Sequence, residues 1–337
     1  MSDPPPPREP ASDAGAQPCL VLTVTPNPSL DLLFETDELV WDDANRMADP
    51  RRRPGGQGIN VVRAVRALGG HAVAMALLGG RTGAEIAAAL AAEGAILLTV
   101  EADGESRTFA AVRERDTGRS LLLNARGPAR TREDALRLLR SAESAIHELR
   151  PRWVACCGSL PPGFPTDFYL PLIAAARSAG SRVVVDCDGD PLRLAAHAGC
   201  DLLVPNEHEA ARLCSMPVSS AASAARAALT LHRAGTPSVA VTLGREGAVL
   251  AAAGRCWLAT PPPLSSGSAV GACDAFLAGL LVAMERGCGP PDSLRLGVAA
   301  GASTLLSVGG ELLSSARIPE VLDRISLQET NFDSRLD

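Results

Sequence analysis

The sequence of 337 residues contains no lysine, and all 32 of its basic side chains are arginine, set against 38 carboxylates. The formal net charge of −6 argues against a nucleic-acid-binding surface. Phe, Trp and Tyr make up only 3% of the chain, so the core has to be built from Ala, Val and Leu, which the 46% hydrophobic content supplies. This length suits one large α/β domain with a side lobe, or two domains.

The chain also lacks an apolar run of the roughly 20 residues needed to span a bilayer, so we expect no membrane contact. Residues 1–19 are rich in Pro, Ala and acid without the apolar segment of a secretory signal, and we expect a disordered tail there. The nine cysteines form no CxxC pair, and Cys156 and Cys157 are adjacent. This pattern favours free thiols in a reducing compartment, and the expected location is the cytoplasm.

Between residues 20 and 318, short apolar segments of high β propensity alternate with segments of helical periodicity. Such alternation is typical of an α/β domain with a mostly parallel sheet and helices on both faces. The expected strands are 20–25, 71–78, 96–100, 153–157, 182–185, 202–204, 238–243 and 248–251. The expected helices include 59–68, 83–93, 132–149, 167–178 and 292–306, and one opening near residue 206.

Two segments do not follow this alternation. Residues 32–54 are polar and irregular, whereas 107–124 reads as a hairpin around Asp116-Thr117-Gly118 with one solvated face. We therefore predict a small β-sheet lid made of these two segments, beside the main domain. Residues 319–337 are expected to form a C-terminal tail.

Residues 265–284, SSGSAVGACDAFLAGLLVAM, are expected to form a turn that leads into a buried helix. The amides of Gly271, Ala272, Cys273 and Asp274 would then be helix-start donors directed at an anion. A carboxylate beside such a turn can accept a proton from a hydroxyl while the amides hold a phosphoryl group in transfer. The plainer alternative is a loop that caps a core helix, with Asp274 only favouring the helix start.

Two further polar groups follow the first strand. Asp31 lies after Pro26-Asn27-Pro28, beyond the carboxyl end of strand 20–25, where open α/β sheets bind their ligands. It is placed to accept hydrogen bonds from substrate hydroxyls, although an ordinary turn carboxylate is an equal alternative. Gly55 and Gly56 allow close backbone approach before the next helix, and Asn60 lies in its first turn.

Taken in order, these motifs resemble those of the ribokinase-like (PfkB) carbohydrate kinases. Residues 55–60 resemble the first signature of that family, and 270–281, VGACDAFLAGLL, resemble the second. Between them, 206–209 is similar to the NxxE element, and 241–244 to the end of the nucleotide-side strand. The resemblance covers roughly residues 20–308. It implies a ribokinase-like three-layer fold with a small lid sheet.

The opening TPNPSLD at 25–31 is similar to that of the phosphosugar kinases in this family, which include 1-phosphofructokinase and tagatose-6-phosphate kinase. The turn GSLPPG at 158–163 resembles the same branch. There, Arg46 and Arg107 match arginines that bind the phosphate the sugar already carries, a task suited to a bidentate guanidinium. The arginine run at 51–53 is expected to face solvent rather than a ligand.

The resemblance implies ATP-dependent phosphorylation of a hexose phosphate, with fructose 1-phosphate favoured and tagatose 6-phosphate or fructose 6-phosphate close behind. Asp274 would be the base, and the amides of Gly271, Ala272 and Cys273 would hold the phosphoryl oxygens. The lid would close over the sugar and offers a surface for a homodimer. The remaining roles fall on Asp31, Gly55, Gly56 and Asn60 for the sugar, Arg46 and Arg107 for its phosphate, Thr242, Gly244, Gly247 and Asn206 for the nucleotide, and Asn206 and Glu209 for Mg²⁺ through water.

Two departures from the family pattern keep a second class of function open. The glycine that usually precedes the catalytic aspartate is Cys273, which would be strained at positive φ but not within the first helical turn, the placement we favour. The usual lysine of the first signature is Gln57, which removes a cation near the phosphates. The alternative is a catalytically weak sugar- or nucleotide-binding protein with a kinase fold. A nucleoside or vitamin kinase is disfavoured by Arg46, Arg107 and the TPNPSLD opening.

Overall fold

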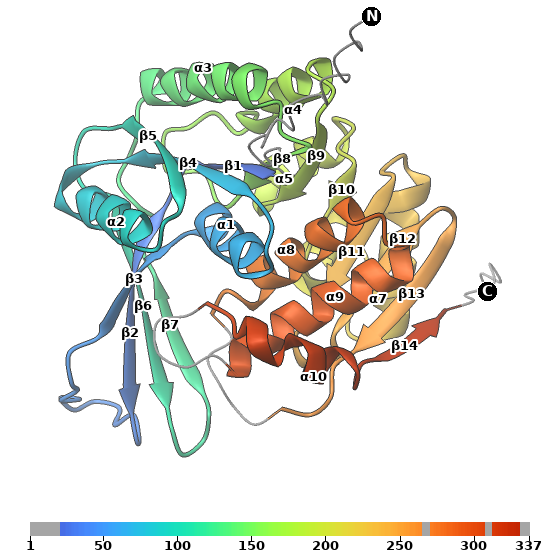
Figure 1. The fold of residues 1–337 in the computed structure, drawn as a ribbon. Helices are drawn as coiled ribbons and strands as arrows, with labels where there is room; N and C mark the ends of the chain where they lie inside the picture. Colours follow the sequence, from blue (N-terminus) through green and yellow to red (C-terminus); the bar gives the residue numbers. More distant parts are fainter. Residues whose placement is uncertain (1–20, 265–269, 307–311, 331–337) are drawn as a thin grey trace, which may run out of the picture.

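The computed structural model describes residues 21–264, 270–306 and 312–330 (Figure 1). Ten strands of this part of the chain form the main sheet in the order β14-β13-β12-β11-β10-β9-β8-β1-β4-β5. The strands from β11 to β5 in this order run parallel, and β12, β13 and β14 add an antiparallel edge. Their bounds are β1 Val21–Thr25, β4 Ala72–Leu78, β5 Ile96–Glu101, β8 Trp153–Cys157, β9 Arg182–Asp186, β10 Leu202–Leu203, β11 Ser238–Thr242, β12 Ala248–Ala252, β13 Arg255–Thr260 and β14 Ser326–Glu329.

Helices cover both faces of this sheet, which confirms the predicted three-layer α/β fold. The core on one face packs α3 Arg132–Leu149, α4 Tyr169–Ser178, α5 Gly189–Ala196, α6 Glu207–Cys214 and α7 Ala221–Arg233. The core on the other face packs α1 Gln57–Ala67, α8 Ala272–Glu285, α9 Pro290–Ser303 and α10 Ile318–Leu322. Because both faces are covered, a strand such as β1 (VLTVT) is buried at every position.

Helix α8 is fixed in place on almost all of its sides. Residues 274–283 are all buried, and the helix lies against both α1 and α9. A Cβ atom on Gly279 would lie 2.7 Å from the carbonyl oxygen of Leu296, so glycine is what allows the α8 and α9 backbones to approach closely. This packing sets the position of the α8 start relative to α1.

Four more of the described strands form a separate small sheet in the order β3-β2-β6-β7, which extends away from the main sheet below α1 and α2 (Figure 1). The strands are β2 Ser29–Thr36, β3 Arg51–Gly55, β6 Arg107–Glu114 and β7 Ser120–Asn124, and α2 Gly80–Ala92 packs against their base. The predicted small sheet is therefore confirmed. The expectation that 32–54 is irregular throughout is wrong at both ends. Residues 32–36 belong to β2, and the polar run RRRPG forms β3 because it pairs with β2.

Several elements have no counterpart in the sequence analysis, namely α5, α7 and β13. The segment expected to be a C-terminal tail, 319–337, carries most of α10 and all of β14, which pairs with β13 and extends the main sheet. The expected tail at 1–19 and the start of the stretch 265–284, at 265–269, lie outside the described residues. None of the described helices combines the length and apolar character that crossing a membrane requires.

Candidate active site at the start of helix α8

The turn into α8 has the backbone geometry of an anion-binding turn. Gly271 is the N-cap with φ 89°, a conformation that residues with a side chain rarely adopt, so glycine is required here by conformation. Ala272, Cys273 and Asp274 follow in the first helical turn, whose amides have no acceptor within the helix. Cys273 does not have a positive φ, so the backbone strain considered for a cysteine at this position is absent.

The Asp274 carboxyl group is buried directly behind this turn. Asn60, in the first turn of α1, donates from Nδ2 to Oδ2 of Asp274 at 2.8 Å. Burial raises the pKa of Asp274 from its ordinary 3.8 to about 7, with the Asp31 carboxylate also raising it and the Asn60 hydrogen bond and Arg53 lowering it. A carboxyl group that titrates near neutral pH is well matched to accepting a proton from a hydroxyl.

A second buried carboxylate, Asp31 on β2, lies within electrostatic range of Asp274. Its Oδ1 accepts a hydrogen bond from Ser29 Oγ at 2.7 Å. Burial raises the pKa of Asp31, and the Ser29 hydrogen bond and the Arg53 cation oppose that rise. The adjoining residue Gly55 leaves the room that this carboxylate occupies, because a Cβ there would lie 2.1 Å from Asp31 Oδ1. Gly56, with φ 103°, is the N-cap of α1.

Arg53 lies between Asp31 and the α8 turn, which contradicts the expectation that the arginine run is solvated. Its neighbours Arg51 and Arg52 are exposed and pair with Glu35 and Glu85. Arg53 is only 8% exposed; its Nε lies 3.8 Å from Asp31 Oδ2, and its Nη2 donates to the Val270 carbonyl oxygen at 3.3 Å. The signal that was missed is register, since Arg53 on β3 stands directly opposite Asp31 on β2.

The two arginines predicted to hold the sugar phosphate have different environments. Arg107, at the start of β6, is half-buried; its Nε donates to the Asn27 carbonyl oxygen at 2.9 Å, and its Nη1 donates to Asn124 Oδ1. Burial lowers its pKa and the nearby Asp31 carboxylate raises it, which places Arg107 beside the site. Arg46 is exposed on the segment that joins β2 to β3, and no contact among the described residues joins it to Asp31 or Arg107.

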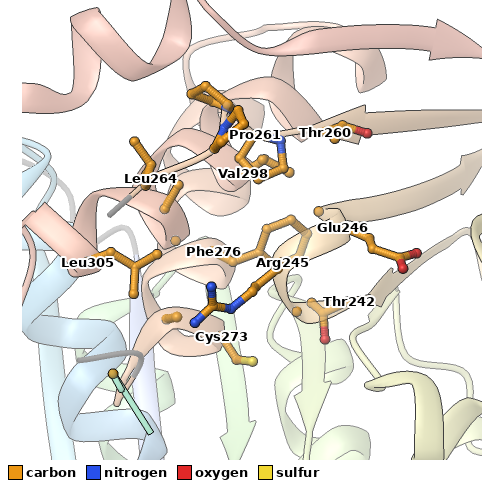
Figure 2. Close-up of a pocket in the computed structure, with 18 of the residues that line it drawn as sticks. Thr242, Arg245, Glu246, Thr260, Pro261, Leu264, Cys273, Phe276, Val298 and Leu305 are labelled. Atoms are coloured by element: carbon orange, nitrogen blue, oxygen red, sulfur yellow. The ribbon is translucent and has the colours of Figure 1, made fainter. Parts of the chain in front are cut away.

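A pocket of about 1070 Å³ begins at the α8 turn and extends between β11, α9 and residues 260–264 (Figure 2). Thr242 and Cys273 lie on one side of it, and Pro261, Leu264 and Val298 lie on the opposite side (Figure 2). Three predicted nucleotide-binding residues, Thr242, Gly244 and Gly247, line the pocket, and so does the turn between β6 and β7. An apolar pocket of this size, lined by the helix-start residues Ala272 and Cys273, suits a nucleotide.

The thiol of Cys273 is exposed to this pocket. The enclosing pocket wall and the nearby Asp186 and Asp274 carboxylates raise its pKa to about 12, so it is uncharged at neutral pH.

Gly247, which also lines the pocket, has to be glycine because a Cβ there would lie 2.0 Å from the Ala259 carbonyl oxygen.

The predicted metal-side residues Asn206 and Glu209 form the capping box of α6. Asn206 Oδ1 accepts from the amides of His208 and Glu209, and Glu209 Oε2 accepts from the Asn206 amide. Burial raises the pKa of Glu209. Within the described part of the chain, no three His, Cys, Asp or Glu side chains converge as a metal site would require. A divalent cation here would need most of its ligands from nucleotide phosphates and water.

Asp186, at the carboxyl end of β9, is a buried site residue that the sequence analysis did not single out. Gln57 donates from Nε2 to its Oδ1 at 3.1 Å, while Oδ2 has no hydrogen-bond partner among the described residues. Burial, and next the Asp274 carboxylate, raise the pKa of Asp186 well above its ordinary value. Its position after a central strand was the available signal, because that edge of the sheet also carries Thr242 and Asn206.

Comparison with known proteins identifies the family and several relatives of this chain. Residues 27–316 match the model of the pfkB family carbohydrate kinases. The chain is 33% identical over 297 residues to the ATP-dependent 6-phosphofructokinase isozyme 2 of Escherichia coli K12, covering 87% of this chain and 95% of that protein. It is 31% identical to the 1-phosphofructokinase of Rhodobacter capsulatus over 91% of this chain and 97% of the relative. A crystal structure of E. coli phosphofructokinase-2 in complex with substrates and products superposes with a TM-score of 0.84 and 30% identity, over 90% of this chain and 98% of that one.

Proposed function

Because the chain belongs to the pfkB family of carbohydrate kinases, we propose that it transfers the γ-phosphoryl group of ATP to a hydroxyl of a hexose phosphate, with fructose 1-phosphate as the favoured acceptor. The observation that carries this proposal is one juxtaposition. A buried carboxyl group titrating near neutrality, Asp274, stands behind a helix-start turn whose amides have no acceptor within the helix, and that turn lines a nucleotide-sized pocket. Each part is common, and phosphoryl transfer to an alcohol uses all of them together.

In the proposed reaction, the Asp274 carboxylate accepts the proton of the acceptor hydroxyl. The hydroxyl oxygen forms a bond to the γ-phosphorus, the bond from that phosphorus to the bridging oxygen breaks, and ADP leaves with the electron pair. The amides of residues 271–274 hold the phosphoryl oxygens, whose charge is spread in the transition state. Asn60 orients the base through its hydrogen bond, and its buried Oδ1 has no hydrogen-bond partner among the described residues, so it can also accept from a sugar hydroxyl, as can Asp31.

Magnesium, when bound, would neutralise charge on the nucleotide phosphates and orient them. Both Asn206 Oδ1 and Glu209 Oε2 already accept hydrogen bonds within the α6 capping box. We therefore propose that these two residues contact the ion only through water, and that the phosphates are its direct ligands. The nucleotide itself would lie along Thr242, Gly244 and Gly247.

The alternative, a catalytically weak binding protein, is not favoured. It depended on the cysteine and the glutamine that replace family residues. Cys273 is accommodated in the helix without a positive φ, and Gln57 donates a hydrogen bond to Asp186 instead of leaving a gap.

The proposed function is tested by measuring ADP release with purified protein, Mg²⁺ and ATP. The acceptors offered in parallel are fructose 1-phosphate, fructose 6-phosphate, tagatose 6-phosphate and unphosphorylated fructose. We expect kcat/KM for the preferred phosphosugar to exceed that for fructose by at least about 10³-fold, because a site built around an anion leaves its cations unpaired without one. A preference for fructose, or no turnover with any acceptor, would count against the proposal.

The small sheet also offers a surface for a second copy of the chain, as the sequence analysis anticipated. Four large apolar side chains on this sheet and its connecting segment are more than half exposed: Val40, Trp41, Leu122 and Leu123. Large apolar side chains left exposed are typical of protein interaction sites, and Leu122 and Leu123, which are adjacent on β7, point to opposite faces of the sheet. We propose that two copies pair through this sheet.

Replacing both Leu122 and Leu123 with glutamate should convert a dimer into a monomer. Whichever face of the sheet forms the interface, pairing would then bury a glutamate carboxylate that has no partner. The measurement is light scattering coupled to size exclusion. Leu136→Glu on α3, where the side chain is 39% exposed, is the matched control and should leave the dimer intact. A monomeric wild-type chain, or a double variant that stays dimeric, would exclude this interface.

A further inference from the structure

Arg53 has a buried guanidinium group whose hydrogen bonds are incomplete. Its Nε has no hydrogen-bond partner among the described residues, and its contact with Asp31 is an ion pair at 3.8 Å rather than a hydrogen bond. Its one hydrogen bond of the site, from Nη2, goes to a neutral carbonyl at 3.3 Å. By contrast, the adjacent Arg52 donates two short hydrogen bonds to the Glu85 carboxylate, at 2.6 and 2.7 Å.

The carbonyl that Arg53 binds belongs to Val270, the residue immediately before the anion-binding turn. The guanidinium therefore lies at the junction of three parts of the site: Asp31, Asp274 and the α8 turn. Burial lowers its pKa, and the carboxylates of Asp31 and Asp274 raise it. A buried cation with unused donors is costly unless a ligand completes its hydrogen bonds.

Charge balance at the site points to an anion as that ligand. Gln57, on the neighbouring turn of α1, is neutral and donates to Asp186, so it brings no positive charge to the phosphates. Arg107 commits its Nε and Nη1 to Asn27 and Asn124. Arg53 is thus the buried arginine beside the turn whose donors remain available to a phosphoryl oxygen.

We propose that Arg53 binds the phosphoryl group in transfer: with both substrates present, its guanidinium exchanges the Val270 carbonyl for an oxygen of that group. This inference rests on the proposed phosphotransfer. A charge-assisted hydrogen bond replaces one to a neutral acceptor, and the gain is largest when charge spreads over the phosphoryl oxygens. The proximity of Arg53 also favours the ionised form of Asp274, so a single side chain assists both the base and the group that moves.

The test compares Arg53→Gln and Arg53→Lys with Arg52→Gln, an exposed neighbour outside the site. We expect Arg53→Gln to lower kcat by roughly 10²-fold, the typical effect of removing one transition-state donor, with both KM values within about threefold of wild type. Arg53→Lys should recover part of this loss, and added guanidinium ion should partly restore Arg53→Gln. Arg52→Gln should match wild type.

The pH profile supplies a measurement that a purely structural role would not change. The groups that face Asp274 are Asn60, Asp31, Arg53, Asp186 and the thiols of Cys157 and Cys273. Removing the one cation of this set should move the acidic limb of kcat to higher pH in Arg53→Gln but not in Arg52→Gln.

Three results would overturn the inference while the wild-type enzyme stays active. One is a raised acceptor KM with unchanged kcat, which would make Arg53 a sugar-binding residue. Another is a lower activity for Arg53→Lys than for Arg53→Gln, with Arg53→Gln folded and not restored by added guanidinium ion. The third is a loss of activity that follows only a lowered melting temperature. A wild-type chain inactive on every phosphosugar would instead be a failure of the proposed function.

Discussion

Replacing Asp274 with asparagine is expected to lower kcat by roughly 10³-fold, while the variant folds and binds ATP as the wild type does. The amide keeps the size of the carboxyl group and can still accept the hydrogen bond from Asn60, but it cannot accept the proton of the acceptor hydroxyl. The measurement is steady-state turnover with the preferred phosphosugar, together with calorimetric binding of ATP. Turnover within tenfold of wild type would remove Asp274 from the role of base.

The same variant should be more stable than the wild type in alkaline buffer, which separates lost chemistry from lost folding. Burial holds the pKa of Asp274 at about 7 in the folded state against 3.8 as the ordinary value, so the folded chain binds this proton more tightly than the unfolded chain. Stability contributed by the protonated group is complete below about pH 4 and is lost as pH rises through 7. At pH 8, we expect the free energy of unfolding of Asp274→Asn to exceed that of the wild type by about 2–4 kcal/mol. The difference should vanish near pH 4, and a gap independent of pH would contradict this account.

The sequence predicted the central part of the fold because local and tertiary preferences agree there. Strands such as β1 and β8 are continuous apolar runs, and in a sheet covered on both faces nothing competes with that pattern. The α8 turn was also recognisable, because Gly271, the small residues around it and the apolar periodicity of the helix all depend on neighbours in sequence.

Elements that depend on distant partners were not predictable in the same way. The run Arg51–Gly55 has poor strand propensity, and it forms β3 only because β2 offers a paired edge. Strand β14 likewise requires β13, which lies more than 60 residues away in the chain. The site residues that were missed, Arg53 and Asp186, follow the same rule, since their importance comes from what stands opposite them in a sheet.

For Arg46 the motif was recognised from the sequence, but the structure of a single chain does not bring the residue to the predicted phosphate site. The residue lies on an exposed segment close in sequence to Val40 and Trp41, which are also exposed. If two copies pair through the small sheet as proposed, this segment would lie at the interface rather than in open solvent. Any contribution of Arg46 to phosphate binding would then depend on the assembly and not on the fold of one chain.

Replacing Gly271 with alanine is expected to lower kcat by about 10- to 100-fold with a modest effect on stability. The residue has φ 89°, where a side chain costs roughly 1–2 kcal/mol, and the added Cβ would lie 2.4 Å from Leu312 Cδ1 and 3.8 Å from Asn60 Nδ2. Leu312 Cδ1 is the end of a flexible side chain that can give way, so we expect the strain at this φ, rather than the contact with Leu312, to shift the turn. A shift of about 1 Å in the donors of a phosphoryl group is enough to cost on the order of 10²-fold in rate.

Gly287, just beyond the other end of α8, provides the matched control. It has φ 78°, close to that of Gly271, but within the described part of the chain an added Cβ there would meet no atom within 4 Å beyond its chain neighbours. Gly287→Ala should therefore carry the same backbone strain, about 1–2 kcal/mol in the free energy of unfolding, with kcat unchanged. The comparison assigns any difference in kcat to the position of the turn rather than to helix stability. Equal kcat values in the two variants would mean that the amides of residues 271–274 do not hold the phosphoryl group, because moving them would then have no effect on its transfer.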